Sequence, residues 1–371
     1  MRSLIALGLL AGCYEPSLPA GAPCPDDVCP NGLVCSPATK TCEHESVPAD
    51  AAPDTDPGTT TAVRYRRRLS IVNNASVALP TGFTIRVAIP TTLATMVAER
   101  KVKADFSDLR VIADGATAER DRIVDPGAGS VPASLSFALQ APIAPGATST
   151  VYSLYYGGTD ATPAAARGTA VFPLYDDFSA GLSPTWLRND GPAVVGGKLV
   201  LRAGHLDALT TTAATDGVPT ISALEISARV NDPTSEPTPQ GNETFYYWFG
   251  YQHTGDFVAT APWALWVARG KGQIHAEQKS PVGCETATAC DGPTAPQSGV
   301  PHYYAIERDP TVTRFFLDGV LSYTATVTNN ADYAIIVRNY LATSDVVIDW
   351  IRARARVSPD PTVTVLNEEP L

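Results

Sequence analysis

Short runs in which apolar and polar residues alternate recur along most of the chain. Residues 84–90 read Thr-Ile-Arg-Val-Ala-Ile-Pro, and residues 224–230 read Leu-Glu-Ile-Ser-Ala-Arg-Val. This period of two predicts β-strands that bury one face. Residues 93–103 are the exception, because their pattern turns briefly helical. The 32 prolines and 28 glycines supply turns between the runs. The pattern predicts an all-β protein.

The alternating runs fall into two groups, and 371 residues are too many for one ordinary domain. The first group fills residues 63–162, and an Ala/Pro-rich stretch at residues 161–169 marks a boundary. The second group fills residues 171–358, which leaves residues 359–371 as a C-terminal tail. We therefore expect two β-sandwich domains.

The N-terminus has the features of an export signal over residues 1–12. Arg2 precedes an apolar run, residues 4–10, that is too short to span a bilayer. The run ends in Leu-Leu-Ala-Gly-Cys at residues 9–13, which resembles the lipobox of bacterial lipoproteins. The resemblance implies that Cys13 carries lipid and anchors the protein to a membrane. Tyr14, where an Asp would favour inner-membrane retention, implies the outer membrane or cell surface. An ordinary secretory signal is the alternative.

The cysteine count agrees with export to an oxidising compartment. Of seven cysteines, removing Cys13 leaves six, an even number available for disulfides. Residues 13–43 hold four of them in a Pro- and Gly-rich stretch without an apolar core, so we expect a disulfide-rich module there, with zinc as the alternative. Three pairings are possible, and we favour Cys24 with Cys35 and Cys29 with Cys42. Cys284 and Cys290 are expected to close a surface loop.

Two further features of composition bear on function. Residues 44–62 are rich in Pro, Ala and Asp without aromatic residues, which predicts a disordered tether. The formal net charge of −11 disfavours a nucleic-acid partner, which needs a basic surface. The one basic cluster is made of Arg64, Arg66, Arg67 and Arg68.

Motifs in both groups resemble known families. Residues 66–71 (RRRLSI), 103–111 (KADFSDLRV) and 155–158 (YYGG) resemble the bacterial domain of unknown function 2341, which has no established chemistry. Residues 302–308 (HYYAIER), 314–319 (RFFLDG) and 348–352 (IDWIR) resemble strands of concanavalin-like lectins and glucanases, a laminin G-like sandwich. That resemblance implies a jelly roll over residues 171–358.

Catalytic motifs are absent from the sequence. Retaining glucanases of this fold place carboxylates on one strand as E-x-D-x-x-E or E-x-D-x-E, because alternate side chains share a face. Residues 224–229 hold Glu225, with Ser227 where the Asp would stand. There is also no G-x-S-x-G, H-E-x-x-H or phosphate loop, and the five histidines are scattered. The sequence therefore predicts that the protein is not an enzyme.

An aromatic strand, residues 245–251 (FYYWFGY), is the candidate ligand site. Tyr246 and Trp248 share one side with Gly250, which would leave room for a ligand, and the opposite side is expected to be core. Trp263 and Trp266 follow on the next apolar stretch and would extend a platform on which sugar rings stack. The alternative is that these aromatics all fill the sandwich.

The concanavalin resemblance also implies a structural calcium ion. The family holds it with a carboxylate from the last strand, which Asp349 matches, and with groups near the first strand, where Asp177 lies; hard oxygen ligands suit calcium. The alternative is that Asp349 accepts hydrogen bonds from a turn or pairs with an arginine. No other cofactor is expected.

Together, these features predict a surface-anchored, non-catalytic carbohydrate-binding or adhesion protein whose partners are a membrane, through its lipid, and polysaccharide. A structural envelope component without a glycan ligand is the alternative, and a divergent glycan-active enzyme is the third. The sequence leaves the oligomeric state open.

Overall fold

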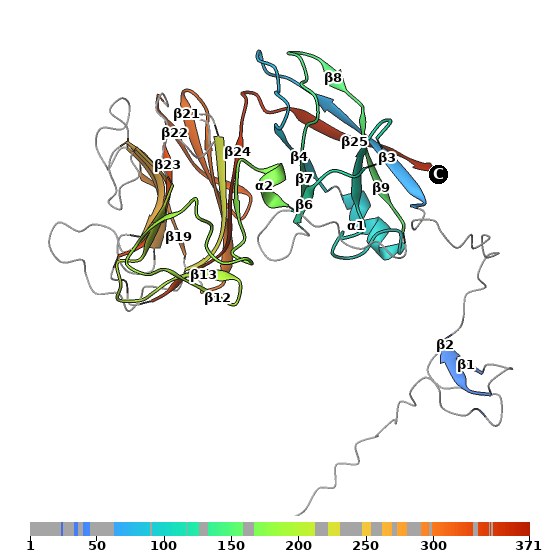
Figure 1. Ribbon diagram of the computed structural model, residues 1–371, viewed down its shortest axis with the longest axis horizontal. Coiled ribbons are helices and arrows are strands. Elements are labelled where there is room, and N and C mark those ends of the chain that lie inside the picture. The colour runs from blue at the N-terminus through green and yellow to red at the C-terminus, as the bar shows by residue number, and fades with distance from the viewer. Residues whose placement is uncertain are drawn as a thin grey trace, which may run out of the picture. The chain divides into compact units, whose positions relative to one another are not determined.

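The computed structural model describes residues 24, 33–35, 40–44, 63–89, 91–116, 118–125, 133–158, 167–211, 222–230, 247–253, 262–268, 273–279, 291–296, 299–328, 333–340, 342 and 344–371. The chain divides into two compact units, Met1–Thr60 and Thr61–Leu371. The second unit is nearly all β, as the alternating pattern predicts (Figure 1). Cys13, the expected signal peptide and the tether over residues 44–62 lie outside the described residues, apart from the backbone of His44.

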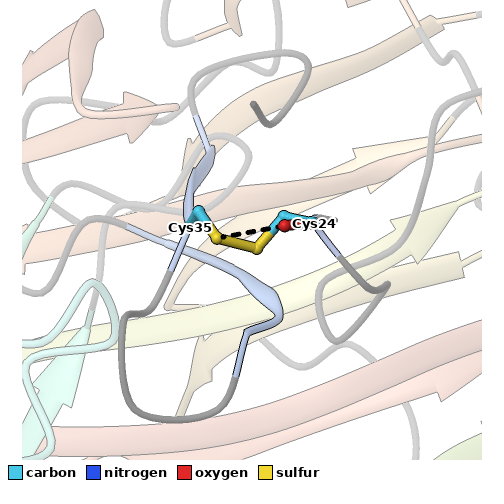
Figure 2. Close-up of a disulfide and its surroundings, with 2 residues drawn as sticks. All are labelled: Cys24 and Cys35. Carbon is cyan, nitrogen blue, oxygen red and sulfur yellow. Dashed lines mark hydrogen bonds between the residues drawn. A yellow bond between two sulfur atoms is a disulfide. The ribbon is translucent and has the colours of Figure 1, made fainter. Parts of the chain in front are cut away.

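The first unit contains a disulfide between Cys24 and Cys35, whose Cα atoms are 6.0 Å apart (Figure 2). Strand β1 (Leu33–Cys35) pairs antiparallel with β2 (Cys42–His44). The Cys24 amide donates to the Lys40 carbonyl at 3.0 Å, which ties the start of the module to the second strand. This disulfide is the first of the two pairings predicted above. Cys29, Cys284, Cys290 and the Cys42 side chain lie outside the described residues.

The second unit begins with a small β-sandwich. Among the described residues it has a five-stranded sheet in the order β25-β3-β9-β5, with β8 beside β3, and a three-stranded sheet in the order β4-β7-β6. Both sheets contribute to one core that includes Leu69, Ile85, Phe137 and Leu154. The elements are β3 (Tyr65–Val72), β4 (Thr84–Ala88), α1 (Thr91–Ala98), β5 (Arg110–Ala113), β6 (Arg122–Asp125), β7 (Ser134–Ala138), β8 (Thr148–Ser149), β9 (Tyr152–Tyr156) and β25 (Thr362–Pro370).

The C-terminal residues, expected as a tail, form strand β25 instead. This strand pairs antiparallel with β3, and Val363 and Val365 pack against the first core. Arg66 hydrogen-bonds Glu369, 303 residues further along the chain. The basic cluster predicted from the sequence is therefore partly neutralised inside the fold by acidic residues of β25.

The second sandwich consists of two larger sheets. In the described part of the chain, one sheet has eight strands in the order β12-β13-β24-β15-β20-β21-β22 with β10 beside β24, and the other has seven in the order β11-β14-β23-β16-β17-β18-β19. The first sheet contains β10 (Leu174–Asp176), β12 (Ala193–Val195), β13 (Lys198–Leu201), β15 (Ser222–Val230), β20 (Pro301–Arg308), β21 (Val312–Leu317), β22 (Val320–Thr326) and β24 (Val346–Ala355). The second contains β11 (Leu187–Asn189), β14 (Ala208–Thr210), β16 (Tyr247–Gln252), β17 (Trp263–Ala268), β18 (Gln273–Lys279), β19 (Asp291–Pro296) and β23 (Ala334–Asn339).

Alternation along the strands decides which side chains lie between these two sheets. On β24, Ile351 and Ala353 belong to the sandwich core, whereas Arg352 and Arg354 lie on the opposite face. Arg352 and Arg354 are nevertheless 1% and 7% exposed, so this outer face of the eight-stranded sheet is itself buried.

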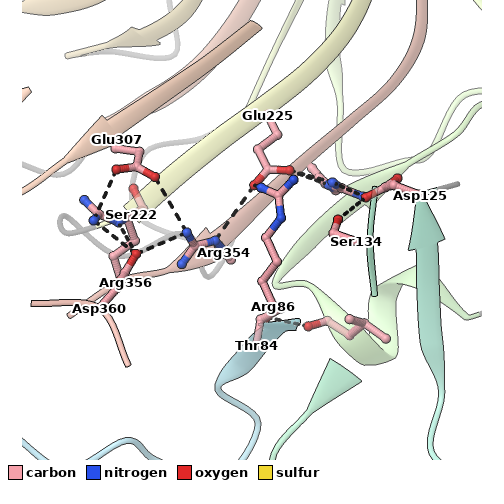
Figure 3. Close-up of polar contacts among 12 residues, drawn as sticks. Thr84, Arg86, Asp125, Ser134, Ser222, Glu225, Glu307, Arg354, Arg356 and Asp360 are labelled. Carbon is pink, nitrogen blue, oxygen red and sulfur yellow. Dashed lines mark hydrogen bonds and ion pairs between the residues drawn. The ribbon is translucent and has the colours of Figure 1, made fainter. Parts of the chain in front are cut away.

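Arg352 connects the two sandwiches. Its guanidinium donates to Asp125 of β6 at 2.7 Å and to Glu225 of β15 at 2.6 Å. Arg86 of β4 donates to the other Glu225 oxygen at 2.9 Å, so ion pairs cross between the domains twice (Figure 3). The short helix α2 (Gly168–Val171) lies beside this contact, and Thr84 donates to the Val171 carbonyl at 2.6 Å.

Arg352 and Arg86 strongly favour the ionised form of Glu225. Burial alone would raise the pKa of Glu225, but Arg352 and Arg86 outweigh burial and lower it to about 2. Glu225 is therefore ionised throughout the physiological range and serves as a fixed anion between the domains.

Among the described residues, no helix is long and apolar enough to cross a bilayer.

Replacing the central cation tests whether the domains depend on it. Arg352→Met should lower the free energy of unfolding by about 3–5 kcal/mol, because Asp125 and Glu225 would stay buried with their main partner gone. Urea unfolding of purified protein measures this change. Lys198→Met is the matched control, because it breaks the half-exposed pair with Asp349 and should cost less than about 1 kcal/mol. A similar small loss for both variants would contradict the role given to Arg352.

Candidate functional site

The outer face of the seven-stranded sheet carries aromatic and charged side chains together. On β16, Tyr247, Phe249 and Tyr251 enter the sandwich core, while Trp248 belongs to a separate cluster on the other face. Strands β17 and β18 continue the alternation with side chains on the same face as Trp248. We call the following set the outer-face cluster: Trp248, Trp263, His275, Glu277, Arg338 and Tyr340.

Glu277 is the buried anion of the cluster. The Trp263 indole N–H donates to its Oε1 at 3.1 Å, and His275 Nε2 lies 3.7 Å from its Oε2. Glu277 is fully buried and His275 is 8% exposed. Lys279 places its Nζ 4.9 Å from the centre of the Trp263 ring. A carboxylate, an imidazole and an indole are thus held together by two neighbouring strands.

Arg338 joins the second aromatic group of the cluster. Strand register places Arg338 of β23 opposite Trp248 of β16. Its guanidinium carbon lies 4.9 Å from the ring centres of both Trp248 and Tyr340. The two rings are stacked with their centres 6.4 Å apart. This arrangement fixes a cation and two ring faces, which suits recognition of a flat, polar ligand.

The predicted ligand residues separate between the two faces of the sheet. Trp248 and Trp263 lie on the outer face, but they are 3% and 8% exposed rather than forming an open platform. Trp266 is in the core, with Tyr304 and Phe315 packed edge-on against its ring, so its assignment to a surface platform is wrong. Tyr246 lies outside the described residues. The alternative that these aromatics all fill the sandwich is also wrong, because Trp248 and Trp263 face away from it.

Gly250 does not make room for a ligand. A Cβ at this position would lie 2.3 Å from the Ala264 carbonyl oxygen and 2.9 Å from Ile306 Cδ1. Its φ of +148° also falls in the region that L-residues rarely adopt. Close packing between strands therefore accounts for the glycine.

The two carboxylates predicted to hold calcium have separate partners. Asp349 pairs with Lys198 and accepts a hydrogen bond from Ser227 at 3.2 Å. Asp177 accepts from the Ser179 hydroxyl at 2.7 Å. In the described part of the chain, the group whose ligand atoms lie close enough to share an ion is Asp190, His205 and Asp207, which contains neither. Calcium binding by Asp349 and Asp177 stays a prediction.

Sequence reasoning missed His275, Glu277 and Arg338. The signal for the first two was present, since His-Ala-Glu places both on one face of a strand. The His-Ala-Glu signal was overlooked because it does not match the longer carboxylate motif of glucanases. Arg338 could not be associated with Trp248 without knowing that β23 pairs with β16.

Comparisons with known proteins assign no family to this chain. No family model and no curated protein matches the chain, so the likeness to domain of unknown function 2341 stays a prediction. Among solved structures, the laminarinase catalytic domain of Thermotoga maritima is 12% identical, with a TM-score of 0.38, over 50% of this chain and 98% of that one. The endo-β-1,3-glucanase of Pyrococcus furiosus has the same identity and score over 50% and 94%. The carbohydrate recognition domain of Emp47p is 11% identical, with a TM-score of 0.37, over 49% and 95%.

The prediction that the protein is not an enzyme is corrected by these findings. The solved structures that are similar to about half of this chain include a laminarinase catalytic domain and a glucanase as well as a carbohydrate recognition domain. The structure also holds the buried carboxylate of Glu277 next to His275, which the motif search did not consider. The lack of a glucanase motif therefore does not exclude catalysis.

Gly250→Ala tests whether packing requires the glycine. The variant should lose about 1–3 kcal/mol more stability than Gly146→Ala, because overpacking forces the strands apart. Gly146 is the matched control, since it also has a positive φ, +69°, but nothing lies within 4 Å of its added Cβ. Thermal and urea unfolding measure both. Equal losses would return Gly250 to the candidates for ligand contact.

Proposed function

We propose that the outer-face cluster binds a carbohydrate chain. The observation that carries the proposal is the placement of two tryptophans, an arginine and a His–Glu pair on one sheet face, away from the sandwich core. Sugar rings present apolar faces that pack on aromatic rings and hydroxyls that need both donors and acceptors. The cluster supplies both kinds of contact.

Each group in the cluster has a distinct part in this proposal. Trp248 and Trp263 offer ring surface, and Arg338 donates from a guanidinium that the aromatic rings hold in place. Glu277 accepts hydrogen bonds from hydroxyls, with its orientation fixed by the Trp263 indole. These groups are almost fully buried, and in buried surroundings a hydrogen bond to a charged group is strong.

Truncation of one indole tests the binding. Trp263→Ala should lower affinity for the glycans retained by the wild-type protein at least about tenfold, because both stacking and the contact that orients Glu277 are lost. A glycan array followed by calorimetry measures this. Trp263→Phe should lose less, since a ring remains. Leu321→Ala, which truncates an exposed apolar side chain on the eight-stranded sheet, is the control and should bind normally. Equal retention by Trp263→Ala would contradict the proposal.

A glycan-active enzyme is the second candidate, and Glu277 favours it. The carboxylate is fully buried and lies 3.7 Å from a histidine, so an acidic and a basic group are neighbours on this sheet face. Most glycoside hydrolases use two carboxyl groups flanking the bond. Strand register pairs Glu277 of β18 with Asp291 of β19.

Hydrolysis can be tested directly with soluble polysaccharides. If the site is catalytic, purified protein should release reducing ends from at least one β-glucan or mucin-type glycan, and Glu277→Gln should slow release at least about 100-fold. Glu99→Gln is the matched control, because it alters an exposed carboxylate on the other sandwich. Release that persists in Glu277→Gln, or none from the wild-type protein, would contradict catalysis at Glu277.

Lipid attachment at Cys13 and a location at the outer membrane or cell surface complete the proposal. They rest on the lipobox-like residues 9–13 and on the disulfide between Cys24 and Cys35, which suits an oxidising compartment.

A further inference from the structure

A cavity lies where the outer face of the eight-stranded sheet meets the first sandwich. The outer-face cluster is on the other sheet of the larger sandwich. The volume of the cavity is about 330 Å³. Arg86 of β4 contributes one wall, and Tyr303 and Glu307 of β20 contribute the other. Asp360, in the connection from β24 to β25, closes one side. Both sandwiches therefore build this cavity.

Arg354 is the central polar group of the cavity. It is 7% exposed, and no hydrogen-bond acceptor meets its buried Nε. Its nearest carboxylate contacts are long: 3.4 Å to Asp360, 3.8 Å to Glu307 and 3.9 Å to Glu225 (Figure 3). The Asp360 Oδ1 atom, also buried, has no donor either. A buried donor and a buried acceptor that line one cavity without partners are unusual, because buried polar groups are normally satisfied.

The neighbouring Arg356 differs from Arg354 because carboxylates lie at hydrogen-bond distance from its guanidinium. It donates to Asp309 at 2.9 Å and to Asp360 at 3.1 Å, and its other contact, with Glu307, is 3.2 Å. Arg352 is held at 2.6–2.7 Å by its two carboxylates. Arg354, near the end of β24, lies between Arg352 and Arg356 along the chain, yet it has no contact this short. Of these three arginines, Arg354 therefore has the most donor capacity left for a ligand.

The charges around the cavity indicate what kind of ligand fits. Arg86 and Arg354 are balanced by Glu307 and Asp360, so an ion of either sign gains little net attraction. A hydroxyl both donates and accepts, so neighbouring hydroxyls can satisfy Arg354 and Asp360 together. Tyr303 and Phe316 add ring surface to the lining.

We propose that this cavity between the domains binds a neutral polyhydroxylated ring compound of the size of a sugar unit. Its volume is at the lower end of the range for small-molecule pockets, about 300–1,000 Å³. The site is separate from the outer-face cluster, which lies on the other sheet, and it does not depend on the function proposed there. Because both sandwiches line it, a bound ligand should also stabilise their contact.

The test uses the Trp263→Ala variant. Binding at the outer-face cluster is expected to be weakened in this variant, so that binding in the cavity is measured by itself. Glucose, galactose, mannose and N-acetylglucosamine are the probes, with glucuronate as the charged comparison, and saturation-transfer NMR and thermal shift are the measurements. We expect saturable binding of at least one neutral sugar with a rise in melting temperature. Adding Arg354→Lys should weaken that binding at least about tenfold, because the lysine keeps the charge but loses the Nε–H donor.

Two further variants make the result decisive. Asp360→Asn alters a partly exposed side chain and should weaken the same sugar while the protein stays folded by circular dichroism. Arg202→Lys is the matched control, since Arg202 pairs with Asp207 away from the cavity, and it should leave binding unchanged. The proposal is overturned if none of the four sugars binds, if Arg354→Lys and Asp360→Asn both bind as well as the control, or if glucuronate binds more tightly than the neutral sugars.

Discussion

A buried arginine between two carboxylates from different sandwiches holds the larger unit together. Arg352 is 1% exposed, and a guanidinium at such a position is stable only while its partners stay in place. One partner, Asp125, comes from the first sandwich, and the other, Glu225, from the second. Separating the sandwiches would leave Asp125 without this cation. It would also expose the apolar ring of Phe172, which lies against the guanidinium. Two hydrophobic cores therefore behave as one compact unit.

Alternation along a strand explains how much could be predicted from the sequence. It correctly gave the all-β class, the short helix at α1 and the two faces of β16, because each is decided by neighbours in the chain. The same rule separates Ile351 and Ala353 from Arg352 and Arg354 on β24. A period of two tells which side chains share a face, but it does not tell what covers that face. Trp248 faces outward as the pattern requires and is nevertheless 3% exposed.

The features that the sequence did not reveal depend on contacts between distant residues. Strand β25 has no fully buried residue, so its pattern resembles a tail until β3 provides hydrogen bonds and Val363 and Val365 pack against the first core. The ion pairs of Arg66 with Glu369 and of Arg352 with Asp125 likewise join residues whose spacing carries no signal. The outer-face cluster required the order of β23, β16, β17 and β18, which no local motif specifies.

Glu225 and Glu277 show why burial alone does not identify a functional carboxylate. Both are almost completely buried, and both lie on strands of the same sandwich. Glu225 is bound by two arginines that lower its pKa to about 2, so it cannot exchange a proton near neutral pH. Glu277 instead has an indole N–H on one oxygen and a histidine 3.7 Å from the other. Cationic partners from both sandwiches fix the Glu225 carboxylate as part of the structure, whereas Glu277 is held by an indole and lies beside an imidazole on the sheet face where we propose the binding site. The partners of each carboxylate, rather than its degree of burial, therefore distinguish the structural Glu225 from Glu277, the candidate ligand-binding residue on the seven-stranded sheet.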